Sequence, residues 1–241
     1  MKKNLYLSPN FSKKRRNKRD IKFIIIHYTG MQSEIESINR LLDKNSKVSC
    51  HYLINRKGKI FNMVPDKKIA WHAGKSKWRE FRNLNDNSIG IELVNKGHLL
   101  GFQNYTKPQI KTLINLCKKL KKTYKIKNSN FLGHSDVSPN RKIDPGEKFP
   151  WKKLSKHNLG LWYKKTRLQI NLESKKKISA KFFKNLYKIG YRYFQLNKRN
   201  YSDKFVIKAF QQRYCPNNVS GLIDKKTLKI SNILAKNLIN S

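Results

Sequence analysis

Two histidines and one aspartate have the residue types of a catalytic metal site. His27 closes a short apolar run, His134 lies just after another apolar step, and Asp144 precedes a Pro-Gly turn. Two imidazoles and one carboxylate are the ligand set of a catalytic zinc ion, which keeps a fourth position for water. Such an ion lowers the pKa of its bound water to about 7 and polarises a carbonyl group. By themselves the three residues support this site only weakly, because histidines in loops are often simply solvated.

Glu92 is an acidic residue within an otherwise apolar run, in a chain that has only 14 aspartates and glutamates. A buried carboxylate is costly unless it is paired. Glu92 therefore either forms a structural ion pair with a lysine or faces the metal-bound water. Lys142 lies two residues before Asp144, and in an extended segment these two side chains point the same way. A cation placed there can stabilise an oxyanion.

The remaining histidines differ in what their surroundings indicate. His72 follows Trp71, and an aromatic platform with polar neighbours suits a sugar-peptide ligand. This pair either lines a substrate groove or forms a structural turn. We expect His51 to be a packing residue or a support for a metal ligand, and His98 and His157 to be surface residues.

Short apolar runs predict strands, and apolar residues at helical spacing predict helices. These elements position the candidate residues. The β-branched run before His27 is typical of a buried strand. Ser33 and Glu36 are spaced as a capping box at the start of a helix. The expected strands are 22–26, 51–54, 60–64 and 88–94, the middle two as a hairpin, and the expected helices are 33–42 and 108–124.

The pattern changes after Pro150-Trp151, where weak periodicity and many charges predict a last helical turn and a linker. From Ser179 onward only helical patterns follow, at 180–189, 203–214 and 224–238. Strands with helices followed by helices alone indicate two domains of different class. We expect an α/β fold with a mixed central sheet flanked by helices, plus a small all-α three-helix C-terminal domain. The expected divisions are a basic tail at 1–20, a catalytic domain at 21–165, a linker at 166–178 and a helical domain at 179–241.

The chain is very basic, with 55 Lys and Arg against 14 Asp and Glu and a formal net charge of +41. Lysine is abundant everywhere, which favours a general compositional bias over a nucleic-acid-binding patch; only residues 13–19 form a dense basic run. We therefore expect no specific nucleic-acid partner. Hydrophobic residues make up 38% of the chain, too many for a disordered polycation.

No apolar run approaches the length of a membrane-spanning helix, so we expect no membrane span. The first residues lack the continuous apolar stretch of a secretory signal. This indicates a cytoplasmic protein, with a periplasmic or cell-wall-associated location as the alternative. We expect a monomer.

Several short stretches of the first two thirds of the chain form an ordered set of motifs. They are IIHYT at 25–29, VSCHYLI at 48–54, AWHAG at 70–74, NSIGIE at 87–92, GHSD at 133–136, KIDPG at 142–146 and FPW at 149–151. In this order they resemble the zinc-dependent N-acetylmuramoyl-L-alanine amidases of type 2, which are related to phage lysozyme-type amidases and peptidoglycan recognition proteins. The resemblance covers about residues 21–165.

The resemblance implies a role for each candidate residue. His27, His134 and Asp144 become the ligands of Zn²⁺, Glu92 the acid/base that helps to activate water, and Lys142 the stabiliser of the tetrahedral oxyanion. The third ligand is aspartate, as in the bacterial muropeptide-cleaving branch, whereas the phage branch usually has cysteine. The three cysteines of this chain therefore lie outside the expected metal site.

The tail resembles the small three-helix peptidoglycan-binding domains that are often joined to wall hydrolases. The matching stretches are 186–191, 206–214 and 221–224 with Thr227 and Leu228. Ile207 and Phe210 are expected in the core, and Asp224 as a helix cap. The domain binds glycan or stem peptide if the resemblance holds, and is otherwise a helical bundle without a ligand.

The expected activity is hydrolysis of the amide bond between the N-acetylmuramic acid lactyl group and L-alanine of peptidoglycan or muropeptides. One alternative is a recognition protein that binds peptidoglycan without cutting it, although the full ligand set favours an enzyme. A basic nucleic-acid-binding protein is the other alternative. The sequence leaves open whether the substrate is the intact sacculus or a soluble anhydro-muropeptide.

Overall fold

A computed structural model of the chain describes residues 6–164 and 174–238. Its centre is a five-stranded sheet with the order β4-β3-β8-β2-β9. β3, β8, β2 and β9 run parallel, and β4 joins β3 antiparallel in the expected hairpin. The prediction of a mixed central sheet is therefore confirmed. The strands are β2 (Phe23–Tyr28), β3 (Tyr52–Ile54), β4 (Ile60–Asn62), β8 (Ser88–Leu93) and β9 (Phe131–Gly133).

Four short strands form two small sheets beside the central one. β1 (Phe11–Ser12) pairs with β5 (Ile69–Ala70), and β6 (Lys77–Trp78) pairs with β7 (Phe81–Arg82). The helices are α1 (Glu34–Leu42), α2 (Lys107–Tyr124), α3 (His134–Val137), α4 (Trp151–Ser155), α5 (Lys175–Ile189), α6 (Asp203–Tyr214) and α7 (Lys225–Asn237). Single 3-10 turns lie at η1 (Lys18–Asp20), η2 (Lys44–Ser46), η3 (Leu84–Asn87), η4 (His98–Leu100) and η5 (Asn128–Asn130).

β2 is buried on both faces, which explains why it reads as an uninterrupted β-branched run. Ile24 and Ile26 belong to the core that contains the apolar side of α2. Phe23 and Ile25 face the opposite way, into a core that contains side chains of α5, α6 and α7. Because alternate residues share a face, His27 lies on the same face as Phe23 and Ile25.

The start of α1 agrees with the sequence, except for one bond of the capping box. Ser33 Oγ accepts a hydrogen bond from the Glu36 backbone N at 3.1 Å. Glu36 Oε2 accepts from the backbone N of Gln32 at 3.2 Å, one residue before the cap. The helix is capped as predicted, but the returning bond reaches one residue further back than expected.

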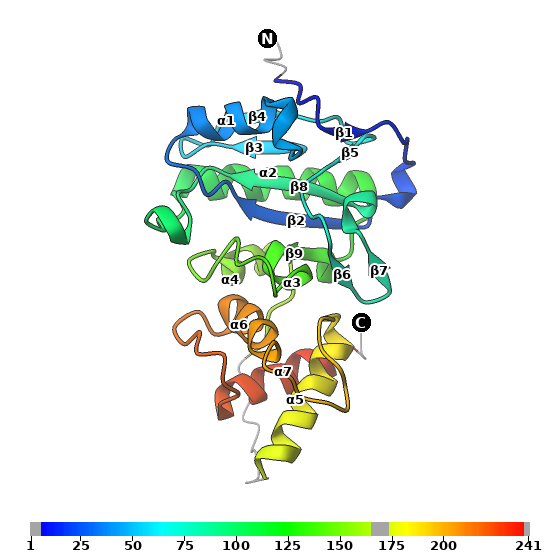
Figure 1. Cartoon of the computed structure of the whole chain (residues 1–241), viewed down its shortest axis with the longest axis vertical. Coiled ribbons are helices and arrows are strands. Elements are labelled where there is room, and N and C mark those ends of the chain that lie inside the picture. Colours follow the sequence, from blue (N-terminus) through cyan, green and yellow to red (C-terminus); the bar gives the residue numbers. More distant parts are fainter. Residues whose placement is uncertain (1–5, 165–173, 239–241) are drawn as a thin grey trace.

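The C-terminal helices form the expected bundle (Figure 1). Ile207 and Phe210 are buried, and Asp224 Oδ1 caps α7 by accepting from the Thr227 backbone N at 2.6 Å. The expected boundary of the first helix was wrong, because α5 begins at Lys175, inside the segment expected as a linker. Residues 165–173 of that segment lie outside the described residues.

The bundle shares a core with the sheet, and a buried ion pair crosses between them. Asp136 of α3 accepts from Arg213 Nη1 of α6 and from Tyr191 Oη, both at 2.5 Å, and from the Gly133 backbone N at 2.8 Å. Arg213 also donates to the Phe131 carbonyl at 2.9 Å. α3 lies between the sheet and the bundle in Figure 1. The C-terminal helices are therefore packed onto the first domain.

The N-terminal segment is part of the folded structure from residue 6, so the expectation of a basic tail at 1–20 was wrong for this part. Arg16 is buried and donates to the Ser88 carbonyl at 2.7 Å and to the Asp66 carbonyl at 2.9 Å. β1 adds a strand pairing with β5. One buried guanidinium thus ties the segment to the strand that carries Glu92.

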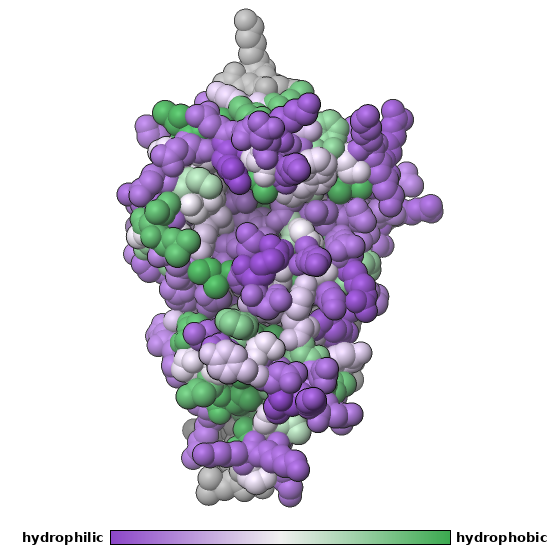
Figure 2. Space-filling view, viewed as in Figure 1, coloured by the Kyte–Doolittle hydropathy of each residue, from purple (hydrophilic) through white to green (hydrophobic). Residues whose placement is uncertain are grey.

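Among the described residues, no helix has both the length and the apolar character needed to cross a bilayer. The face shown in Figure 2 is mostly hydrophilic, with scattered apolar patches, as the high net charge requires.

Replacing Arg213 by alanine leaves Asp136 buried without its cation. Removal of one partner of a buried ion pair costs about 3–5 kcal/mol, so we expect a fall of this size in the free energy of unfolding, measured by urea denaturation. Arg15→Ala removes an exposed arginine and is the matched control, with an expected change below about 0.5 kcal/mol. Equal effects of the two substitutions would contradict the structural role of Arg213.

Candidate active site

The three candidate ligands lie where parallel strands of the central sheet end. His27 is the fifth residue of β2, and His134 begins α3 directly after β9. Asp144 lies in the loop after α3, and its carbonyl accepts from the backbone N of Ser135 at 2.8 Å. β2 and β9 are neighbours in the sheet, so the two imidazoles start from adjacent strand ends.

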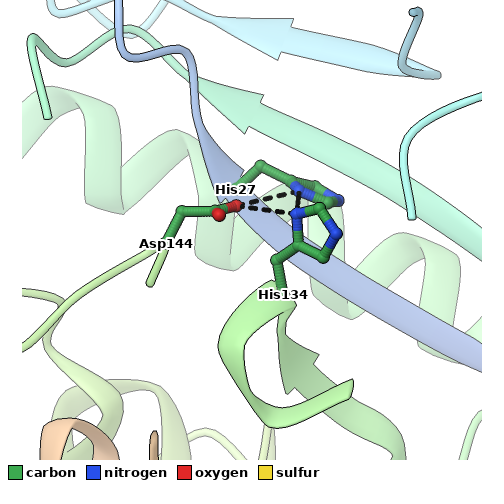
Figure 3. Close-up of side chains that lie close together, drawn as sticks. All are labelled: His27, His134 and Asp144. Atoms are coloured by element: carbon green, nitrogen blue, oxygen red, sulfur yellow. Dashed lines mark hydrogen bonds and ion pairs between the residues drawn. The ribbon is translucent and has the colours of Figure 1, made fainter. Parts of the chain in front are cut away.

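The three side chains converge on a common point (Figure 3). His27 Nδ1 lies 3.0 Å from His134 Nδ1 and 3.0 Å from Asp144 Oδ2. His134 Nδ1 lies 3.2 Å from the same Asp144 oxygen. All three side chains are buried. One atom from each residue therefore forms a nearly equilateral triangle that is shielded from solvent.

Hydrogen bonds outside the triangle determine which nitrogen of each ring carries its proton. His134 Nε2 lies 3.1 Å from the Ala73 carbonyl, which can only accept, so this nitrogen carries the hydrogen. In the neutral ring, His134 Nδ1 then carries no proton and presents a lone pair. The same reasoning applies to His27 through a longer chain of contacts.

That chain runs from His27 through His72 to Ser88. The Ser88 hydroxyl donates its only hydrogen to the Leu84 carbonyl at 2.5 Å, so its oxygen accepts from His72 Nε2 at 3.2 Å. His72 Nδ1 must then accept from His27 Nε2 at 3.1 Å. His27 Nδ1 is consequently a lone pair as well. Support of this kind fixes the tautomer and orientation of metal-binding histidines.

The triangle consists of two imidazole lone pairs and a carboxylate oxygen, three acceptors that repel one another unless a cation lies between them. A tetrahedral ion with bonds of about 2.0–2.1 Å holds its ligand atoms about 3.3–3.4 Å apart. The observed separations of 3.0–3.2 Å are close to this value. The residues fit a divalent metal ion with an open fourth position.

The electrostatics agree with this set of protonation states. Burial and the neighbouring His134 lower the pKa of His27 to about 4, against the opposing effect of Asp144. Burial alone would raise the pKa of Asp144, but the two facing imidazoles outweigh it and leave that pKa lowered. At neutral pH His27 is therefore a neutral ligand and Asp144 an anionic one.

A glycine on β8 makes room for the supporting histidine. A Cβ atom at Gly90 would lie 2.4 Å from His72 Cγ, closer than any real contact. The glycine that interrupts the predicted strand is thus explained by the ring that packs on it. It is the one signal in the sequence that could have located the support of His27.

Glu92 faces the metal site from the neighbouring strand. It is the register partner of His27 in the parallel pairing of β2 and β8, and paired residues project from the same face. Its Oε2 is buried and has no hydrogen-bond partner among the described residues. Burial, together with the nearby charge of Asp144, raises the pKa of Glu92 to about 8, and Lys142 opposes this rise.

A cleft of about 480 Å³ contains all seven residues selected from the sequence. Trp71 lies on its wall, where a ligand can contact the indole. Both ring nitrogens of His72 are engaged by His27 and Ser88, which leaves neither for a substrate. The lining residues that carry the argument are His27, Trp71, His72, Glu92, His134, Lys142 and Asp144.

The other histidines lie outside the triangle. His51 is buried, as expected, and its Nδ1 accepts from the Gly90 backbone N at 3.0 Å. His157 is exposed, also as expected. The expectation of a surface residue was wrong for His98, which lies 2.9 Å from Glu147 Oε2 and 3.0 Å from Tyr28 Oη. No motif in the sequence indicated that network.

Comparison with known proteins agrees with the geometry. Residues 17–147 match Amidase_2, the N-acetylmuramoyl-L-alanine amidase family. The amidase AmiD of Escherichia coli is 35% identical over 229 residues, which cover 89% of this chain and 82% of AmiD. This chain belongs to the N-acetylmuramoyl-L-alanine amidase family. It is an amidase that hydrolyses the bond between N-acetylmuramic acid and L-alanine, as the motifs predicted.

Solved structures of relatives extend the similarity to the C-terminal helices of this amidase. The E. coli AmiD complex with anhydro-N-acetylmuramic acid-L-Ala-D-gamma-Glu-L-Lys superimposes with a TM-score of 0.81 at 32% identity, covering 94% of this chain and 93% of AmiD. AmpDh3 from Pseudomonas aeruginosa gives 0.82 at 29% identity, covering 95% and 96%. The anhydro-muropeptide amidase AmpD of Haemophilus influenzae is 35% identical over 164 residues, 61% of this chain and 86% of AmpD.

Replacing Ser88 by alanine removes the acceptor that orients His72 and, through it, His27. Loss of such a support typically costs 10–100-fold in metal affinity, and we expect about a tenfold weaker affinity for Zn²⁺, measured by competition with a chromophoric chelator. Ser155→Ala changes a serine on α4 that bonds only within its own helix and is the control. An unchanged affinity in Ser88→Ala would refute the proton assignment of His27.

Proposed function

We propose that this amidase is a zinc enzyme that cleaves the lactyl–L-alanine amide of peptidoglycan or of muropeptides derived from it. The observation that carries the proposal is the convergence of two imidazole lone pairs and a carboxylate oxygen at 3.0–3.2 Å from one another. These three groups lie in a cleft that Glu92 also lines, and Glu92 Oε2 has no hydrogen-bond partner among the described residues. His27, His134 and Asp144 hold the ion.

A zinc ion at this place supplies an acidified water and a polarised carbonyl group. Both imidazoles are held by hydrogen bonds on the side away from the ion, so the ligand atoms need no rearrangement to bind it. Asp144 brings one negative charge, which leaves the site with net positive charge for a developing oxyanion. The soft thiolate ligand of the phage branch is replaced here by a harder oxygen.

Glu92 takes a proton from the attacking water and returns it to the nitrogen of the leaving L-alanine. Its position supports this role, since it is paired with His27 on the same face, lines the cleft and has a buried oxygen without a hydrogen-bond partner among the described residues. A carboxyl group whose pKa is raised to about 8 also holds a proton well between the two steps. Water and the amide thereby give a carboxylic acid and an amine.

Lys142 stabilises the negative charge that develops on the carbonyl oxygen. It lines the cleft, and its charge lowers the pKa of both His27 and Glu92, so it lies within electrostatic reach of both. Trp71 offers an aromatic wall to the sugar or peptide. The relative AmiD has been solved with an anhydro-muropeptide substrate, which supports a muropeptide as the ligand of this cleft.

A recognition protein that binds without cutting is the less favoured alternative. Such a protein has no need for a complete metal triangle and a carboxylate in register with one ligand. Both features are present here, and they support hydrolysis.

Replacing Glu92 by glutamine removes the proton acceptor and preserves the shape of the side chain. General acid–base groups contribute about 10²–10⁴-fold, so we expect kcat on an anhydro-muropeptide to fall by this factor, with Zn²⁺ affinity unchanged. Glu36→Gln neutralises a carboxylate at the start of α1 and leaves activity intact. Turnover is measured by mass spectrometry of the products. Full turnover by Glu92→Gln would refute the role of Glu92.

Replacing Lys142 by glutamine removes the charge that lowers the pKa of Glu92. Because Glu92 must be ionised to accept a proton, activity rises with pH through this pKa, and the acidic limb of the kcat/KM profile should move to higher pH in Lys142→Gln. The rate at the optimum should also fall, since the oxyanion loses a cation. Lys153→Gln, at an exposed residue of α4, should leave the profile in place. An unmoved limb in Lys142→Gln contradicts the proximity of Lys142 and Glu92.

A further inference from the structure

A second cavity, of about 630 Å³, lies between the β6–β7 hairpin and the segment that follows α5. It is larger than the cleft that holds the metal triangle. Four cationic side chains and several aromatic rings line it. The cations are Lys77, Arg79, Arg82 and Arg192, and the tyrosines are Tyr187 and Tyr193.

The cations of this cavity outnumber its acidic side chains, since Glu80 is the one carboxylate among the lining residues. Within residues 6–164 and 174–238, no carboxylate forms an ion pair with any of the four. Lys77 and Arg82 are register partners across the hairpin, and like charges directly opposite each other destabilise a strand pair. Burial lowers the pKa of Arg79 and of Arg192, so both charges have lost hydration. Arg192 donates to the carbonyls of Tyr187 and Tyr191, so an anion in the cavity would chiefly relieve the repulsion between Lys77 and Arg82.

The walls of the cavity are fixed before any ligand arrives. The Arg79 backbone N donates to the Gly190 carbonyl at 2.8 Å, which joins the hairpin to the end of α5. A Cβ atom at Gly190 would lie 2.5 Å from the Trp78 indole, so hairpin and helix end are in close contact. Trp78 also packs edge-on against Tyr191, whose hydroxyl binds Asp136. The network that holds α3 therefore also positions the cavity.

The cavity adjoins the active-site cleft. The Lys75 carbonyl accepts from Arg141 Nη2 at 3.2 Å and from Tyr193 Oη at 3.1 Å. Arg141 lines the cleft and Tyr193 lines the cavity. Two side chains that meet on one carbonyl oxygen thus connect the two hollows. Arg141 also donates to the Ala73 carbonyl, which is the partner of the ligand His134.

We propose that this cavity is a second binding site, for a carboxylate-bearing peptidoglycan segment next to the unit being cleaved. The proposal rests on the proposed function of the cleft. A γ-linked glutamate, as in the ligand of the AmiD complex, keeps a free α-carboxylate, and guanidinium groups pair with carboxylates in two-pronged geometry. Arg192 lies over one face of the Tyr187 ring and Lys77 over one face of the Tyr193 ring, so the opposite faces are the ones that can pack against sugar rings. A polymer that continues beyond the cleaved unit can extend from the cleft into the adjoining cavity.

A second cationic hollow in the chain provides a comparison. It lies along α2 and is lined by lysines such as Lys118 and Lys122, with His157 and without a tyrosine, phenylalanine or tryptophan. It has similar charge but neither the aromatic faces nor the connection to the cleft. General attraction of a polyanion to a basic protein would use both hollows equally.

The test uses the full chain, because the C-terminal helices share a core with the sheet. Lys77→Gln/Arg82→Gln removes two charges from the cavity, and Lys118→Gln/Lys122→Gln removes two from α2. Turnover is measured on purified sacculi and on a soluble anhydro-muropeptide, with a cooperative urea transition at or above the wild-type midpoint as proof of folding. We expect the cavity variant to lose about 5- to 30-fold in kcat/KM on sacculi, with turnover of the soluble fragment within about twofold of wild type. The α2 variant should match wild type on both.

Three results would overturn the proposal. They are full activity of the cavity variant on sacculi, an equal loss on both substrates, and an equal loss in the α2 variant. Binding of Glu92→Gln to sacculi, with and without the cavity substitutions, tests the site when no turnover occurs, so failure of the amidase reaction is distinguishable from failure of this site. Cavity-dependent binding of a single-stranded oligonucleotide, without cavity-dependent binding of sacculi, would also count against it.

Discussion

The mutual repulsion of three lone pairs in a buried triangle is the constraint on which the rest of this structure depends. His27, His134 and Asp144 place acceptor atoms 3.0–3.2 Å apart, out of reach of water. Such a cluster is unfavourable without a cation and strongly binding with one. The fold must therefore hold it rigidly, by strand register on one side and by hydrogen bonds to Ala73 and His72 on the other.

The support of this site extends into the C-terminal helices. α3 begins with His134 of the triangle and carries Asp136 half a turn later, and Asp136 is held by side chains of the bundle. A helix of four residues has little stability of its own, so tertiary contacts determine its position. The bundle therefore supports the helix that carries His134.

The charge of the chain has different consequences in different places. Most lysines are exposed and reflect composition, but a few cations are buried or unpaired, and these carry information. Arg16 and Arg213 satisfy backbone carbonyls and a carboxylate. The cations between the β6–β7 hairpin and the end of α5 form no ion pair among the described residues, although Arg192 donates to two backbone carbonyls. The place of a charge in the structure, rather than the total charge of the chain, therefore indicates whether that charge serves solubility or recognition.

The sequence by itself determined the ligand types, the strand that ends at His27, the hairpin, the long helix α2 and the three C-terminal helices, because hydrophobic periodicity and short motifs are local properties. It also indicated the family, through the order of its motifs. Only the tertiary structure decided that His72 orients His27, that Asp136 joins Arg213 across 77 residues, and that residues 6–20 pack against the sheet. These facts depend on contacts between segments far apart in the chain, and no local pattern encodes which distant partner a polar side chain will meet.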